Sequence, residues 1–96
     1  MPLTVDEGFL KIVLFLTNGS NLRITEEWSG GELNEYSYYW LNERNELIIG
    51  WDNVPHYKKI ENFPHHKHIG KQKTRVPSYE TTLEEVMEII EKEITG

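Results

Sequence analysis

The order of apolar and polar residues predicts β-strands through the first half of the chain. Residues 9–16 form an apolar, β-rich run, the Asn-Gly pair at 18–19 is a strong two-residue turn signal, and residues 22–25 alternate apolar with polar side chains. This pattern is typical of a β-hairpin. The Ser-Gly-Gly sequence at 29–31 interrupts it, so we expect a break there.

A second hairpin is expected after this break. Residues 36–41 form an aromatic strand, and polar residues 42–45 join it to a strand at 47–51. The elements expected next are an irregular loop at 53–62, a fifth strand at 63–69 and a basic loop at 70–78.

The C-terminal segment changes to a helical period. Its apolar residues recur at three- and four-residue steps, with glutamates on the other face, which predicts an amphipathic helix. Either Thr81 with Glu84 or Thr82 with Glu85 supplies a capping box. The apolar residues are Leu83, Val86, Met87, Ile90 and Ile94. The predicted fold class is therefore α+β, an antiparallel sheet of about five strands with one C-terminal helix packed on it, in a single domain spanning residues 1–96.

Composition and the lengths of apolar runs exclude several chemistries and argue against several cellular locations for this domain. The chain has no cysteine, which excludes disulfides, thiolate metal ligands and a cysteine nucleophile. Its longest apolar run, Ile12–Leu16, is far shorter than the roughly 20 residues of a membrane-spanning helix. Residues 1–7 are acidic, unlike a secretory leader. We therefore expect a cytoplasmic protein with no membrane partner.

The net charge of −6 hides an uneven distribution. Residues 52–76 carry six Lys or Arg against two Asp or Glu, a net charge of +4, whereas the rest of the chain carries four against fourteen, −10. A basic segment on an acidic domain is suited to a phosphate backbone or an acidic partner.

All four histidines, at 56, 65, 66 and 68, lie within this basic segment. Because histidine can transfer protons and bind metals, the segment is the first candidate for a functional site. In an extended strand, His66 and His68 share one face while His65 and Lys67 point to the other. The cluster is therefore expected to form two half-sites.

Two chemical interpretations of the histidines remain open, beside a purely structural one. In the first, Asp52, His56, His66 and His68 are catalytic and cleave RNA by acid–base transfer without a metal or other cofactor. Tyr57 is an alternative proton donor in this scheme. In the second, His66 and His68 bind a divalent metal with Asp52 or His56 as third ligand. The residues expected to contact RNA in the first scheme are His65, Lys67, Lys71, Lys73 and Arg75.

The aromatic residues of the predicted sheet are expected mainly in its interior. Trp40 and Trp51 occupy strand positions typical of core or sheet-face packing. Tyr36 and Tyr38 are similar, although two tyrosines on one exposed sheet face are also suited to stacking on RNA bases.

Two motifs resemble a known family. The sequences Trp-Asp-Asn-Val-Pro-His at 51–56 and Phe-Pro-His-His-Lys-His at 63–68, followed by an acidic helix, closely resemble the TumE-type toxins of bacterial and archaeal toxin–antitoxin modules. Position 57, often a second histidine in that family, is Tyr57 here. The resemblance implies a small cytoplasmic toxin whose partner is a cognate helix-turn-helix antitoxin.

The leading hypothesis is a toxin that acts on RNA or the ribosome, as a metal-independent endoribonuclease or translation inhibitor. The alternatives are a non-catalytic RNA- or protein-binding module and a metal-binding regulatory domain. An exposed edge strand such as residues 22–25 is a candidate for pairing with the antitoxin or in a homodimer.

Overall fold

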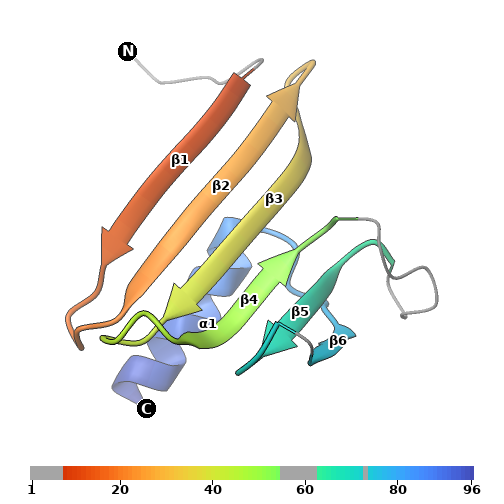
Figure 1. Cartoon of the computed structure of the whole chain (residues 1–96). Coiled ribbons are helices and arrows are strands. Elements are labelled where there is room, and N and C mark those ends of the chain that lie inside the picture. Colours follow the sequence, from red (N-terminus) through yellow and green to blue (C-terminus); the bar gives the residue numbers. More distant parts are fainter. Residues whose placement is uncertain (1–7, 55–62, 73) are drawn as a thin grey trace.

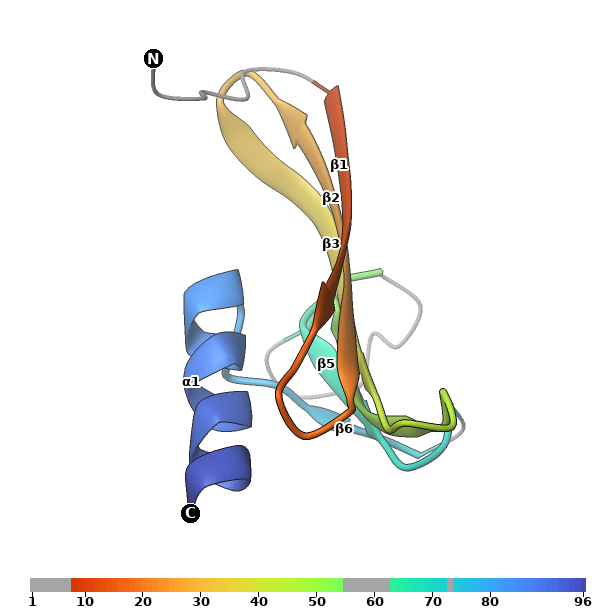
Figure 2. The ribbon, with the colours of Figure 1, turned by 90° about the vertical axis from the view of Figure 1, so that its left-hand side faces the viewer.

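The computed structural model of the chain describes residues 8–54, 63–72 and 74–96. One antiparallel sheet has its strands in the order of the sequence, and a single described helix lies against one face of it (Figures 1 and 2). This confirms the predicted α+β class, with six strands instead of about five. The elements are β1 (Gly8–Phe15), β2 (Asn21–Ser29), β3 (Glu32–Leu41), β4 (Leu47–Asp52), β5 (His66–Ile69), β6 (Arg75–Pro77) and α1 (Leu83–Thr95).

Tight turns keep consecutive strands adjacent. Gly19, between β1 and β2, has φ 87°, which favours glycine, and Leu16 and Ser20 close the turn with a 2.9 Å backbone hydrogen bond. The glycines at 30–31 have φ values of 59° and 75°, as a two-residue turn with both central residues at positive φ requires. The expected break at 29–31 is therefore a third hairpin turn, and β2 continues directly into β3.

The region after the fourth strand differs from the prediction in two ways. The fifth strand is shorter than residues 63–69 and begins at His66. The basic loop expected at 70–78 contains β6, which pairs with β5 in the register His66↔Pro77 and His68↔Arg75. A strand of three residues is too short to show an alternating pattern, so periodicity could not predict it.

The hydrophobic core lies between the sheet and α1. Tyr36, Tyr38 and Trp51 are at most 2% exposed and belong to one cluster with Val86 and Ile90 of the helix. The core assignment of Trp51 is thereby confirmed, as is that of Trp40, which is 4% exposed. The idea that the two tyrosines stack on RNA bases is wrong for this fold, because the face that carries them is buried.

Helix α1 begins at the second of the two predicted caps. The Thr82 hydroxyl accepts a hydrogen bond from the backbone N–H of Glu85 at 3.2 Å, and the Glu85 carboxylate accepts from the backbone N–H of Thr81. The acidic first turn also suits the positive end of the helix dipole. With 13 residues, α1 is short, and in the part of the chain that the structure describes no helix has the length and apolar character needed to cross a membrane.

The edge strand is not the one expected. Residues 22–25 belong to β2, which pairs with β1 on one side and β3 on the other. The edge of the sheet at this end is β1 (Figure 1). Apolar side chains on both faces of this strand are exposed, among them those of the neighbours Ile12 and Val13. Phe15 is 85% exposed and Phe9 is 71% exposed. Apolar edges of this kind are typical of surfaces for protein association. Strand pairing with a partner stays a prediction, and in this fold it would involve β1 instead of β2.

Candidate functional site

Strand register gathers one set of polar residues on the sheet face opposite α1, called here the far face. Trp51 points into the core on the helix side, so its neighbour Asp52 points to the far face. Asp52 lies directly across from His66 of β5, and His68 lies across from Gly50. The prediction that His66 and His68 share a face is therefore confirmed, and Asp52 joins them there.

Asp52, His66 and His68 form what we call the Asp52 cluster. The Nε2 atom of His66 lies 2.8 Å from Oδ1 of Asp52, and the Nε2 atom of His68 lies 3.2 Å from Oδ2. All three residues are at most 4% exposed. One carboxylate thus contacts both imidazoles, one with each oxygen, in a site nearly closed to solvent.

Backbone carbonyls hold the opposite side of each imidazole. Nδ1 of His66 lies 3.0 Å from the carbonyl oxygen of Pro64, and Nδ1 of His68 lies 2.7 Å from that of Gln72. Because a carbonyl oxygen only accepts hydrogen bonds, each Nδ1 carries a proton and donates it. Both rings are therefore fixed in orientation, with Nε2 directed at the carboxylate.

Tyr39 and Gly50 also belong to the site, although the sequence reasoning did not select them. The Tyr39 hydroxyl donates to Oδ2 of Asp52 at 3.3 Å. Its ring passes over Gly50, where a Cβ atom would lie only 2.2 Å from the ring carbon Cδ1. A glycine inside the apolar β4 strand was the available signal, since it often marks the close approach of another group.

His65 lies outside the Asp52 cluster. Its Nδ1 is 2.9 Å from the Tyr36 hydroxyl, and the two rings stack with centroids 5.8 Å apart. Burial lowers the pKa of His65, and the neighbouring His66 acts in the same direction. Burial, aided by the negative charge of Asp52, raises the pKa of Tyr36, so this phenol stays protonated and can donate to the neutral imidazole.

Lys67 points to the helix side of the sheet, as the alternation predicted. Its Nζ donates to the Glu80 carboxylate at 3.1 Å. Burial by itself would raise the pKa of Glu80, but hydrogen bonds from Lys67 and from the backbone, with the lysine charge, outweigh it and hold this pKa below its ordinary value. Lys67 therefore joins the sheet to the segment before α1, away from the cluster.

Replacing Lys67 by methionine is expected to lower the free energy of unfolding by about 0.5–1 kcal/mol at pH 7. The folded state lowers the pKa of Glu80, so this pair stabilises the protein above the carboxylate's unfolded pKa and ceases to do so as the pH falls through its folded pKa. Urea unfolding of both proteins from pH 7 down to about pH 3 measures the difference. If the difference in unfolding free energy between the two proteins does not shrink as the pH falls, the ion-pair explanation is wrong.

The remaining predicted residues are distributed around the cluster. Arg75 of β6 is exposed and lies opposite His68 in the strand register, which places it on the far face. Lys71 is exposed in the turn between β5 and β6. His56, Tyr57 and Lys73 lie outside the described residues.

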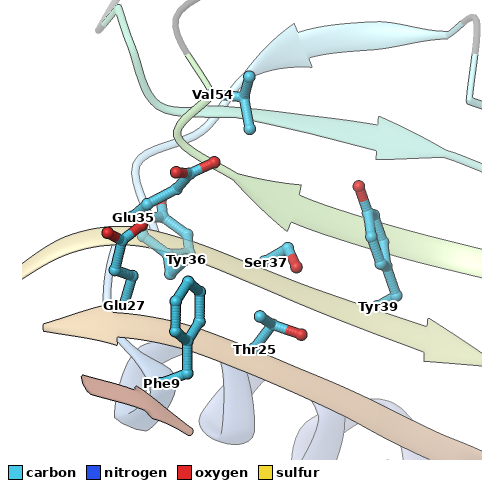
Figure 3. Close-up of a pocket in the computed structure, with 8 residues that line it drawn as sticks. All are labelled: Phe9, Thr25, Glu27, Glu35, Tyr36, Ser37, Tyr39 and Val54. Atoms are coloured by element: carbon cyan, nitrogen blue, oxygen red, sulfur yellow. The ribbon is translucent and has the colours of Figure 1, made fainter. Parts of the chain in front are cut away.

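A pocket of about 270 Å³ adjoins the cluster on the far face. Figure 3 shows Phe9, Thr25, Ser37 and Tyr39 rising from neighbouring strands along it, with the carboxylates of Glu27 and Glu35 at one end. Ser37 lies opposite Asp52 in the register, and Tyr39 both lines the pocket and contacts Asp52. The pocket therefore borders the buried Asp52 cluster through Ser37 and Tyr39.

The fold and site define a small α+β protein with a carboxylate–imidazole cluster on the face of its sheet that the helix leaves uncovered. Comparison with protein families shows which family this protein belongs to. The family model described as Toxin TumE matches residues 2–94, nearly the whole chain, and the chain belongs to this family. It is thus the toxin component of a toxin–antitoxin module, with an antitoxin as its partner. Comparisons with curated proteins and with solved structures give no match.

Proposed function

We propose that this toxin cleaves RNA on the far face of its sheet, with the Asp52 cluster as the chemical centre. The observation that carries the proposal is the contact of one buried carboxylate with both imidazoles, at 2.8 and 3.2 Å. Groups of this kind, fixed by hydrogen bonds next to a pocket, are typical of sites that move protons or stabilise charge.

The surroundings of the cluster are suited to a nucleotide. On one side, the pocket combines the Phe9 ring with the carboxylates of Glu27 and Glu35, which repel phosphate and accept hydrogen bonds from base amino groups. On the other side, exposed Arg75 carries the positive charge that a phosphate requires. A base in the pocket and a phosphate near Arg75 would place the backbone of the RNA across the cluster.

The acid–base route requires a rearrangement of this geometry. A histidine that acts on substrate uses one ring nitrogen for the reaction while its partner holds the other. In His66 and His68 a carbonyl holds Nδ1 and Asp52 faces Nε2. Proton transfer to RNA would therefore require Nε2 to turn from Asp52 to the substrate.

Cleavage of end-labelled total RNA by the purified protein tests the proposal. Asp52→Asn keeps the shape of the side chain, and Glu84→Gln changes an exposed carboxylate on the helix as a matched control. We expect discrete fragments from the natural protein and from Glu84→Gln, and cleavage at least about 100-fold slower with Asp52→Asn. Parallel reactions with added Zn²⁺ and with EDTA distinguish metal-independent acid–base cleavage from cleavage that requires a metal bound by the cluster. Intact RNA with the folded natural protein under both conditions would contradict RNA cleavage.

The exposed apolar edge of β1 favours a second function, inhibition by binding without cleavage. Phe15 and Val13 are 85% and 49% exposed. An edge strand that faces only solvent usually carries charged side chains at such positions instead of apolar ones. In this alternative, Val13→Lys would abolish growth inhibition in cells while Asp52→Asn would leave it intact. The reverse result would favour the cleavage proposal. In both, we expect the antitoxin to be a helix-turn-helix protein and the toxin to act in the cytoplasm.

A further inference from the structure

The two imidazoles of the Asp52 cluster present the same nitrogen to the same carboxylate. Since the carbonyls of Pro64 and Gln72 fix the proton of each neutral ring on Nδ1, each Nε2 carries a lone pair. Those lone pairs lie 2.8 and 3.2 Å from the oxygens of Asp52, which are acceptors too. Acceptors this close to each other need a positively charged species between them.

One cation shared by all three groups meets this need. The ring centroids of His66 and His68 are 5.0 Å apart, and both Nε2 atoms are directed at the carboxylate of Asp52. A single ion placed between them would contact every ligand at once. The site is at most 4% exposed, so the protein side chains shield such an ion from bulk solvent.

The geometry points to a divalent transition-metal ion held by Asp52, His66 and His68, and we propose that these residues form a zinc-class site. One ligand atom from each residue lies within 4.8 Å of the others. Two imidazole nitrogens with one carboxylate oxygen are a donor set that selects Zn²⁺ or a similar ion over Mg²⁺ and Ca²⁺. Three protein ligands leave the fourth tetrahedral position for water or another oxygen ligand.

The surroundings have the hydrogen bonds that metal ligands commonly need. Histidine ligands usually donate their second ring N–H to a carbonyl or carboxylate, and ligating carboxylates are themselves hydrogen-bonded. Here the Pro64 and Gln72 carbonyls accept from the two Nδ1 atoms, and Tyr39 donates to Asp52. Gly50 leaves the space that the Tyr39 ring needs to reach the carboxylate. The inference uses the same cluster as the proposed RNA cleavage but does not depend on RNA as the target.

Calorimetric titration of chelator-treated, full-length protein with ZnCl₂ tests this site. We expect one Zn²⁺ per chain, with affinity reduced at least about 100-fold in Asp52→Asn and about 10- to 100-fold in Tyr39→Phe. His65→Gln is the matched control, because it removes a neighbouring histidine outside the cluster and should leave the affinity unchanged. Absence of stoichiometric Zn²⁺, equal affinity in Asp52→Asn, or loss only in His65→Gln would overturn the proposal.

A second measurement keeps the test valid if a variant fails to fold. Co²⁺ added to the natural protein should give the intense visible absorption bands of a four-coordinate site, and one equivalent of Zn²⁺ should remove them. Weak bands typical of six-coordinate Co²⁺ would overturn the inference without any variant. Zn²⁺ binding with RNA left intact would contradict only the cleavage proposal, whereas RNA cleavage in EDTA by protein that binds no Zn²⁺ would contradict only the metal site.

Discussion

Replacing Asp52 by alanine is expected to lower the free energy of unfolding by about 3–5 kcal/mol, the usual effect of removing one partner from a buried ionic group. The carboxylate is 3% exposed and contacts the Nε2 atoms of both His66 and His68. Its removal leaves two buried imidazoles without their shared partner, in an environment that solvates them poorly. For a domain of this size, the loss is a large part of the total stability.

Urea unfolding of the metal-free protein measures this effect, with two comparison variants. Asp52→Asn retains the shape and offers one acceptor and one donor in place of two acceptors, so its loss should be smaller than that of Asp52→Ala. Glu84→Ala removes an exposed carboxylate from α1 and should change the stability by less than about 1 kcal/mol. An Asp52→Ala effect no larger than that of Glu84→Ala would show that the cluster contributes nothing to stability.

Gly50→Ala is expected to destabilise the protein by about 1–3 kcal/mol and to displace the Tyr39 ring. The added Cβ would lie 2.2 Å from Cδ1 and 2.4 Å from Cε1 of that ring, closer than non-bonded carbons approach. Gly50 is not among the glycines with positive φ, so the backbone itself accepts alanine. The ring must therefore move away from β4, and its hydroxyl then loses the hydrogen bond to the Asp52 carboxylate.

A double-mutant cycle isolates this steric cause. In a Tyr39→Ala background the obstructing ring is gone, and Gly50→Ala should then cost less than about 0.5 kcal/mol, giving a coupling energy of about 1–3 kcal/mol. The proton resonances of the Tyr39 ring should also shift in Gly50→Ala alone. Equal destabilisation in both backgrounds would mean that the Tyr39 ring is not the cause.

The local pattern of apolar and polar residues was sufficient to predict most of the secondary structure. The alternation at 22–25 and the aromatic run at 36–41 gave strands, and the three- and four-residue apolar steps gave α1, because these periods follow from backbone geometry alone. The same alternation placed His66 and His68 on one face. Local pattern failed at β6, where three residues show no period, and at 29–31, where two glycines form a turn instead of a break.

The sequence by itself therefore determined the α+β class, the amphipathic helix, the core tryptophans and the pairing of His66 with His68 on one face. The tertiary structure alone decided that Asp52 stands between those histidines, because this contact follows from the register of β4 against β5. It also decided that Gln72 holds one ring and that Tyr39 reaches Asp52 over Gly50. The contacts of Asp52 join residues distant in the chain and depend on strand pairing, whereas the contact of Gln72 with His68 is local and depends on the conformation of the turn after β5. No local period encodes either kind of geometry.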